Sequence, residues 1–93
     1  MDIFTQIALR IIKEQESIIG PLAWSEASKV PGFSQVNRKG SSIEMSGDKK
    51  DLVNKLIAQY ERLFGKASHE VCRDAVKDLV TKLPAEDVPT SLK

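Results

Sequence analysis

The chain has few of the residues from which catalytic and metal sites are built. Its 93 residues include one cysteine, Cys72, and one histidine, His69. A single cysteine excludes a disulfide within the chain, and one cysteine with one histidine is too few ligands for a zinc site. Cys72 falls within an apolar stripe, where a thiol is a small hydrophobic group of raised pKa. The sequence therefore predicts neither an enzyme nor a bound metal or cofactor.

Phosphate loops, aromatic side chains and an excess of one charge are also lacking. Gly40, Gly47 and Gly65 are isolated, and no Walker-type sequence surrounds them. Aromatic residues make up 5% of the chain, and 14 basic residues oppose 13 acidic ones, for a net charge of +1. Such a chain has no overall field that attracts nucleic acid or anionic lipid, and it has too few aromatic rings for a base-stacking platform.

No uninterrupted apolar run is long enough to span a bilayer, because charged and polar residues break the N-terminal apolar segment. We do not expect that segment to be a signal peptide either, since Asp2 lies where a positive region would be and no small-residue cleavage site follows. Hydrophobic residues (41%) and charged residues (29%) have the shares typical of a soluble globular protein. We therefore expect a soluble, cytoplasmic protein with one domain.

Amphipathic helical periodicity covers most of the chain. At 52–64 and again at 67–83, apolar residues recur every three or four positions, which is typical of helices that bury one face. A similar stripe covers 3–19. The pattern predicts four helices, at 3–19, 21–29, 49–64 and 66–82.

Residue types at the ends of these segments support the helix boundaries. Asp2 and Asp48 can accept hydrogen bonds from the free amides of a first helical turn. Gly20-Pro21 is suited to end one helix and begin another. At Gly20 and at Gly65 two interpretations stay open, a turn between two helices or a continuous helix with a kink.

Two segments lack helical periodicity. Residues 31–47 are rich in glycine and serine, and Ile43 and Met45 alternate with polar residues as in a short strand. A small hairpin turning at Asn37–Gly40 and an irregular ordered loop both fit this connection. Residues 84–93 contain two prolines and few apolar anchors, so we expect a flexible tail.

The two helical segments resemble each other. Aligning 11–30 with 56–75 superposes two apolar stripes and two glycines. The identical pairs are Ile12 with Ile57, Glu16 with Glu61, and Gly20 with Gly65. We expect two helix–glycine–helix corners, at 2–30 and 48–83, that bury their apolar faces against each other. The predicted fold is all-α, with four helices in two pseudo-repeated corners within a single domain at 1–83.

Two stretches carry a resemblance to known proteins. EQESIIGPLAWSEA at 14–27 and QYERLFGKASHEVCRDAV at 59–76 resemble sequences of small, uncharacterised helical domains of bacteria, cyanobacteria in particular, some of them attached to signalling proteins. The resemblance covers about 8–80 and includes no catalytic residue. It implies a regulatory or adaptor setting.

The single tryptophan has two interpretations. Trp24 is either a core residue or an anchor for a partner, because tryptophan is enriched at binding hot spots. In the second case it can form an exposed apolar patch with Leu22, Phe33 and Met45.

The basic residues form one cluster along the sequence. Its members flank the connection and are Arg38, Lys39, Lys49 and Lys50. Such a patch could contact phosphates, although nearby acids dilute it. His69 shares a helix face with other charged residues, and we expect it to be solvated.

These observations favour a protein–protein interaction module, adaptor or regulatory, whose partner the sequence does not name. We also expect a homodimer, because the apolar stripes are wider than a small two-layer monomer can cover. A nucleic-acid-binding helical domain that uses the basic cluster is the alternative function.

Overall fold

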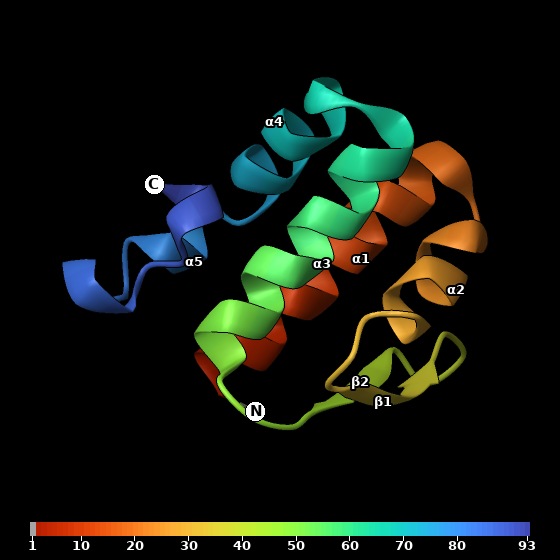
Figure 1. Cartoon of the computed structure of the whole chain (residues 1–93), viewed down its shortest axis with the longest axis horizontal. Helices are drawn as coiled ribbons and strands as arrows, with labels where there is room; N and C mark the ends of the chain where they lie inside the picture. Colours follow the sequence, from red (N-terminus) through yellow and green to blue (C-terminus); the bar gives the residue numbers. More distant parts are fainter. Residues whose placement is uncertain (1) are drawn as a thin grey trace.

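Two long helices run side by side and in the same direction through the centre of the computed structural model, which describes residues 2–93 (Figure 1). They are α1 (Ile3–Ile19) and α3 (Lys49–Phe64). The buried face of α1 includes three isoleucines, and that of α3 carries Leu52, Val53 and further apolar residues one and two turns on. Packing of these two stripes forms the core that the sequence periodicity predicts.

Both long helices begin at the predicted aspartates. The Asp2 side chain accepts a hydrogen bond of 3.0 Å from the Thr5 N–H. The Asp48 side chain accepts from the N–H groups of Lys50 and Asp51. These side chains satisfy backbone donors that have no partner within the helix.

Both long helices end at a glycine, which settles the question of turn or kink in favour of a turn. Gly20 has φ +73° and Gly65 has φ +87°, and each N–H donates to the carbonyl four residues earlier. A non-glycine residue rarely adopts these angles. The chain then continues in shorter helices, α2 (Leu22–Ser28) and α4 (Lys66–Ala75).

The connection between the two helical halves is a hairpin, so the fold is mainly α with a small sheet rather than all-α. Strands β1 (Phe33–Asn37) and β2 (Ser42–Met45) pair antiparallel, with a register irregularity in β1. The hairpin packs against α1 and α2, and Phe33 and Ile43 are buried in the common core. This packing explains why a two-stranded sheet, weak in isolation, forms here.

The predicted fourth helix is broken in two. Helix α4 ends at Ala75, Val76 departs from helical geometry with φ −117°, and α5 (Lys77–Val80) follows. The Arg10 guanidinium donates to the Ala75 carbonyl oxygen (3.1 Å) and to Asp78 Oδ1 (3.0 Å). A residue of α1 therefore contacts both sides of the break, and local periodicity does not reveal this contact.

The C-terminal residues pack on the domain, unlike the flexible tail expected from the sequence. They form two single turns, η1 (Ala85–Asp87) and η2 (Thr90–Leu92), and η2 lies against α3 and α4. Pro89 is fully buried and Leu92 is buried. Figure 1 shows this segment at the side of the molecule, next to α5, turning back toward α4.

One continuous core joins all these elements, with buried apolar residues from both helical halves, the hairpin and the C-terminal segment. No helix formed by residues 2–93 has the length and apolar character that crossing a membrane requires.

Candidate functional site

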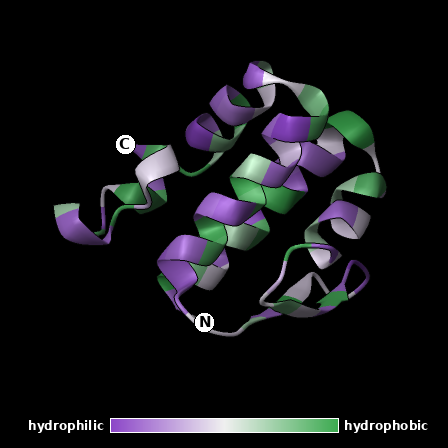
Figure 2. Cartoon of the chain, in the orientation of Figure 1, coloured by the Kyte–Doolittle hydropathy of each residue, from purple (hydrophilic) through white to green (hydrophobic). Residues whose placement is uncertain are grey.

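Exposed apolar side chains gather beside the two glycine turns. Among the described residues, four large hydrophobic side chains are exposed, and each is within two positions of Gly20 or Gly65 along the chain. They are Ile18 (59% exposed), Leu63 (46%), Leu22 (45%) and Phe64 (38%). Figure 2 shows hydrophobic residues on both connections, which lie near each other at one end of the molecule. Clustered exposed apolar residues, unlike scattered ones, mark interaction surfaces.

A shallow pocket of about 120 Å³ lies at this end. The end of α1, the end of α3 and the first turns of α4 supply its walls. Its apolar lining, which we call the corner face, consists of Ile18, Ile19, Phe64, Ala67 and Val71. Gln15 and Ser68 complete the lining, so no titratable side chain among the described residues lines this pocket. The corner face can accept an apolar side chain, and it has no group for acid–base chemistry.

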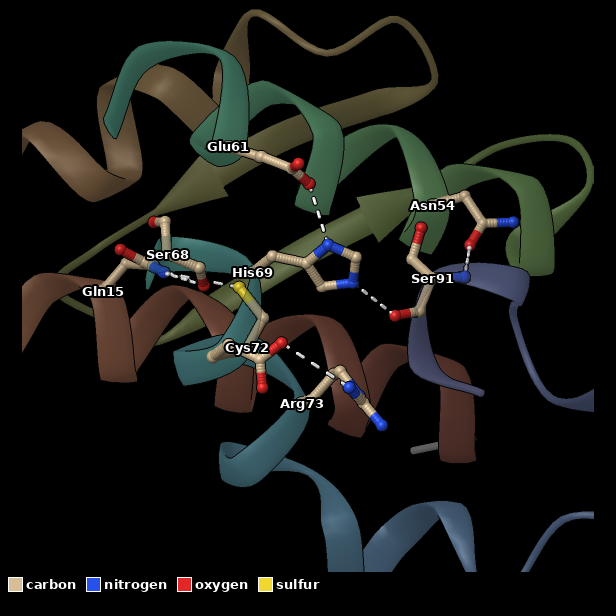
Figure 3. Close-up of polar contacts among 9 residues, drawn as sticks. Gln15, Asn54, Glu61, Ser68, His69, Cys72, Arg73 and Ser91 are labelled. Carbon is tan, nitrogen blue, oxygen red and sulfur yellow. Dashed lines mark hydrogen bonds and ion pairs between the residues drawn. The ribbon is translucent and has the colours of Figure 1, made fainter. Parts of the chain in front are cut away.

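A buried glutamine holds the helices that form the pocket. Gln15 is 1% exposed, and its Nε2 donates to the Ser68 carbonyl oxygen (3.2 Å) and to Cys72 Sγ (3.3 Å) (Figure 3). In the sequence, Gln15 appears only as an interruption of the apolar stripe. Its buried amide links α1 to α4 through these two hydrogen bonds. Without them, burial of the amide would cost free energy.

Cys72 is a structural residue, as the sequence indicates. Its side chain is fully buried, and burial raises the pKa of the thiol to about 11, against the smaller opposite effect of the hydrogen bond from Gln15. The thiolate that a nucleophile requires is therefore scarce at neutral pH.

The residues of the predicted apolar patch do not meet on the surface. Trp24 and Phe33 are 4% and 7% exposed and belong to the core, Met45 is half-buried, and Leu22 is exposed. The structure thus supports the core interpretation of Trp24 and leaves only Leu22 fully available to a partner.

The Trp24 indole lies next to a charged pair. An ion pair with Arg38 lowers the pKa of Glu16, and the indole N–H of Trp24 contributes in the same direction. The indole nitrogen nevertheless lacks a hydrogen-bond partner of good geometry within the described part of the chain. We therefore take its contact with Glu16 as electrostatic proximity rather than a well-formed hydrogen bond.

The predicted basic cluster is also dispersed. Arg38 pairs with Glu16 near the end of α1, whereas Lys49 pairs with Asp2 at its start, at 2.8 Å. These two acids are separated by about 20 Å at the rise of an α-helix. Lys50 donates to the carbonyl oxygen of Glu86, and Lys39 is exposed in the hairpin turn. The four cations therefore do not converge on one phosphate-binding surface.

We expected His69 to be solvated, but its two ring nitrogens both contact protein atoms. Its Nδ1 lies 2.8 Å from Glu61 Oε2, and its Nε2 lies 2.6 Å from the carbonyl oxygen of Ser91 (Figure 3). Glu61 is eight residues before His69 and Ser91 is 22 residues after it. In the sequence, only the presence of an acidic residue at the end of the preceding helix could have suggested the contact with Glu61. Within residues 2–93 no group of histidine, cysteine and carboxylate side chains is arranged to hold a metal ion.

Comparisons of the chain with protein-family models, with curated proteins and with solved structures find no match. The resemblance to bacterial helical domains thus stays an expectation.

Proposed function

We propose that this chain is a protein-binding module that associates through the corner face, and that the occupant of that face is a second copy of the chain. The observation that carries this proposal is the exposure of Ile18 (59%) and Phe64 (38%) around one apolar pocket. Burying such a side chain contributes about 1.5–3 kcal/mol, so covering several of them can drive association.

The chemistry of the corner face suits a homodimer. In a twofold dimer the same surface lies on both sides of the interface. An acidic or basic face would then meet its own charge, which is unfavourable. The described lining of this pocket carries no charge, so two copies can approach without repulsion. A prominent side chain, Ile18, and a hollow lie on the same face, which lets each copy provide one feature to the other.

The proposed internal repeat agrees with this arrangement. The alignment of the two helical units pairs Ile19 with Phe64, and both line the pocket. A pseudo-twofold relation between the units would place these equivalent residues on either side of one hollow. The resemblance to small bacterial domains implies an adaptor or regulatory role for the assembly.

The test is the mass of the protein in solution between about 5 μM and 1 mM. We expect the wild-type mass to rise toward that of a dimer, and we expect Ile18→Lys to stay monomeric because it places a charge in the interface. Lysine is chosen because a cation is favourable near a helix C-terminus. Ser17→Lys, at an exposed position outside the pocket lining, is the matched control and should dimerise. A monomeric wild-type mass over the whole range would refute the homodimer.

A further inference from the structure

The C-terminal segment contacts the domain in the manner of a bound peptide. Val88 and Pro89 are extended, with φ/ψ of −72°/121° and −56°/139°. Pro89 is fully buried, Leu92 is 8% exposed, and Val88 packs against the core. We call Val88–Leu92 the docked segment. Its two main apolar anchors are three residues apart.

Side chains of two helices bind the backbone of the docked segment. Asn54 Oδ1 of α3 accepts from the Ser91 N–H at 2.9 Å, and His69 of α4 binds the Ser91 carbonyl oxygen at 2.6 Å (Figure 3). Both backbone groups of one residue are therefore satisfied from outside the segment. Peptide-binding proteins combine such backbone hydrogen bonds with pockets for selected side chains.

A third residue orients the histidine. A carbonyl oxygen only accepts, so His69 Nε2 must be the donor in its contact with Ser91. Glu61 Oε2 lies 2.8 Å from the other ring nitrogen and accepts from it when that nitrogen carries a proton, which orients the ring. Asn54, Glu61 and His69 thus form a polar set, which we call the peptide site, and none of them lines the corner pocket.

The docked segment is short and contains a single turn of three residues, and segments with few buried apolar contacts open at a small fraction of the global free energy of unfolding. Beyond the peptide site, a hydrogen bond from Lys50 to the Glu86 carbonyl oxygen helps to hold the segment. The central helices α1 and α3 also pack directly against each other, so their mutual contact needs no residue of the segment.

We propose that the surface of α3 and α4 around Asn54, Glu61 and His69 is a peptide-binding site, and that the chain's own docked segment is its displaceable occupant. The ligand is a short segment of another protein with a proline three residues before a leucine and one turn between them, as in the docked segment. The intramolecular segment then acts as an autoinhibitory contact, since a competitor must displace it.

The test uses the full chain and a fluorescent peptide with the sequence of residues 87–93, DVPTSLK. Leu92→Asp in the protein removes one buried anchor and should free the peptide site. We expect fluorescence anisotropy to show saturable binding of the peptide to this variant. Binding to the wild type should be at least about tenfold weaker, because a tethered competitor has an effective concentration in the millimolar range.

Matched variants distinguish specific recognition of the peptide from nonspecific binding. Adding Asn54→Ala or His69→Ala to Leu92→Asp should weaken peptide binding at least tenfold, whereas adding Lys55→Ala, also on α3 but lining a different pocket, should not. A peptide in which serine replaces the proline and the leucine should not bind. Equal binding of both peptides, or no binding to Leu92→Asp at 1 mM peptide, would overturn the proposal.

A second measurement covers the case in which Leu92→Asp fails to fold. In isotope-labelled wild-type protein, excess unlabelled DVPTSLK should displace the docked segment and shift the Ser91 amide resonance toward its disordered position. The resonances of the hairpin, which lies away from η2, should stay unchanged and serve as the internal control. An unshifted Ser91 resonance at millimolar peptide would refute a displaceable segment.

Discussion

Individual polar side chains determine how the helices of this protein are positioned against one another. Apolar stripes allow helices to pack in several registers, but a buried donor must find an acceptor. The Tyr60 hydroxyl of α3 donates to the Ala23 carbonyl oxygen of α2 at 2.6 Å, and burial raises the pKa of this phenol. Gln15 performs the same role between α1 and α4. Each of these contacts selects one packing arrangement.

Asp2 gives a residue-scale prediction about acid sensitivity. Its hydrogen bond with Lys49 is the largest cause that lowers the pKa of Asp2 from 3.8 to about 2. A pKa lower in the folded state means that the stabilisation is fully present above pH 4 and is lost as the pH falls through 2. Because both side chains are exposed, the pair contributes about 0.2–1 kcal/mol.

Asp2→Asn removes the charge and keeps a good helix cap. We expect urea denaturation to show lower stability than wild type at pH 7 and a difference that shrinks as the pH falls toward 2 and vanishes below it. Lys49→Met should show the same convergence, since it removes the other member of the pair. A difference that persists unchanged at pH 2 would contradict this assignment.

At the scale of elements, the two glycine turns determine the architecture. They allow α1 and α3 to stop abruptly, so that α2 and α4 change direction and can fold back on the long helices. The same turns leave the flanking residues Ile18 and Phe64 at the surface, although both belong to the apolar stripes of their helices. The candidate site is therefore a consequence of where these helices end.

Gly65 provides the prediction at this scale. With φ +87° and ψ −178° it occupies a region that is almost confined to glycine. We expect Gly65→Ala to destabilise the protein by about 1–3 kcal/mol in chemical denaturation. The cause is backbone strain alone, because an added Cβ would meet no atom within 4 Å.

Gly40→Ala is the matched control, since Gly40 is not in the positive-φ region and an added Cβ would make only ordinary contact with Asn37. Its effect should be smaller than that of Gly65→Ala. If Gly65→Ala instead stabilises the protein, the chain is a continuous helix at this position, and our assignment of a turn between α3 and α4 is wrong.

At the scale of the whole molecule, one core connects the two helical halves. Ile7 of α1, Leu56 of α3 and Cys72 of α4 belong to the same buried cluster. A core shared in this way is expected to open cooperatively, as small single domains do.

Cys72 tests this cooperativity. Its thiol is fully buried, so a thiol reagent should reach it only after the surrounding helices open. We expect native labelling at least about a thousandfold slower than labelling in denaturant, given the folded-to-unfolded ratios of small domains. Ser17→Cys in a Cys72→Ala background supplies an exposed control thiol that should react rapidly in both conditions. Comparable rates for Cys72 with and without denaturant would show that its helix face is not buried.

Local interactions explain why much of the fold can be predicted. Capping by Asp2 and Asp48, the helical period of the apolar residues, and the stop at each glycine all act over a few neighbouring positions. The sequence by itself therefore determined the first and third helices with approximate bounds that agree with the structure, the presence of the two shorter helices that follow them, and the central position of the segment that forms the hairpin.

Only the tertiary structure decided which side of each stripe stays exposed and where the polar side chains lie. The burial of Trp24, the break at Val76 and the contacts of His69 with Ser91 depend on residues far apart in sequence. The predicted patch failed to assemble for this reason, and the corner face depends on how α1, α3 and α4 meet. Periodicity measures how much of a helix is apolar, but the shape of the opposing surface determines how much of it is covered.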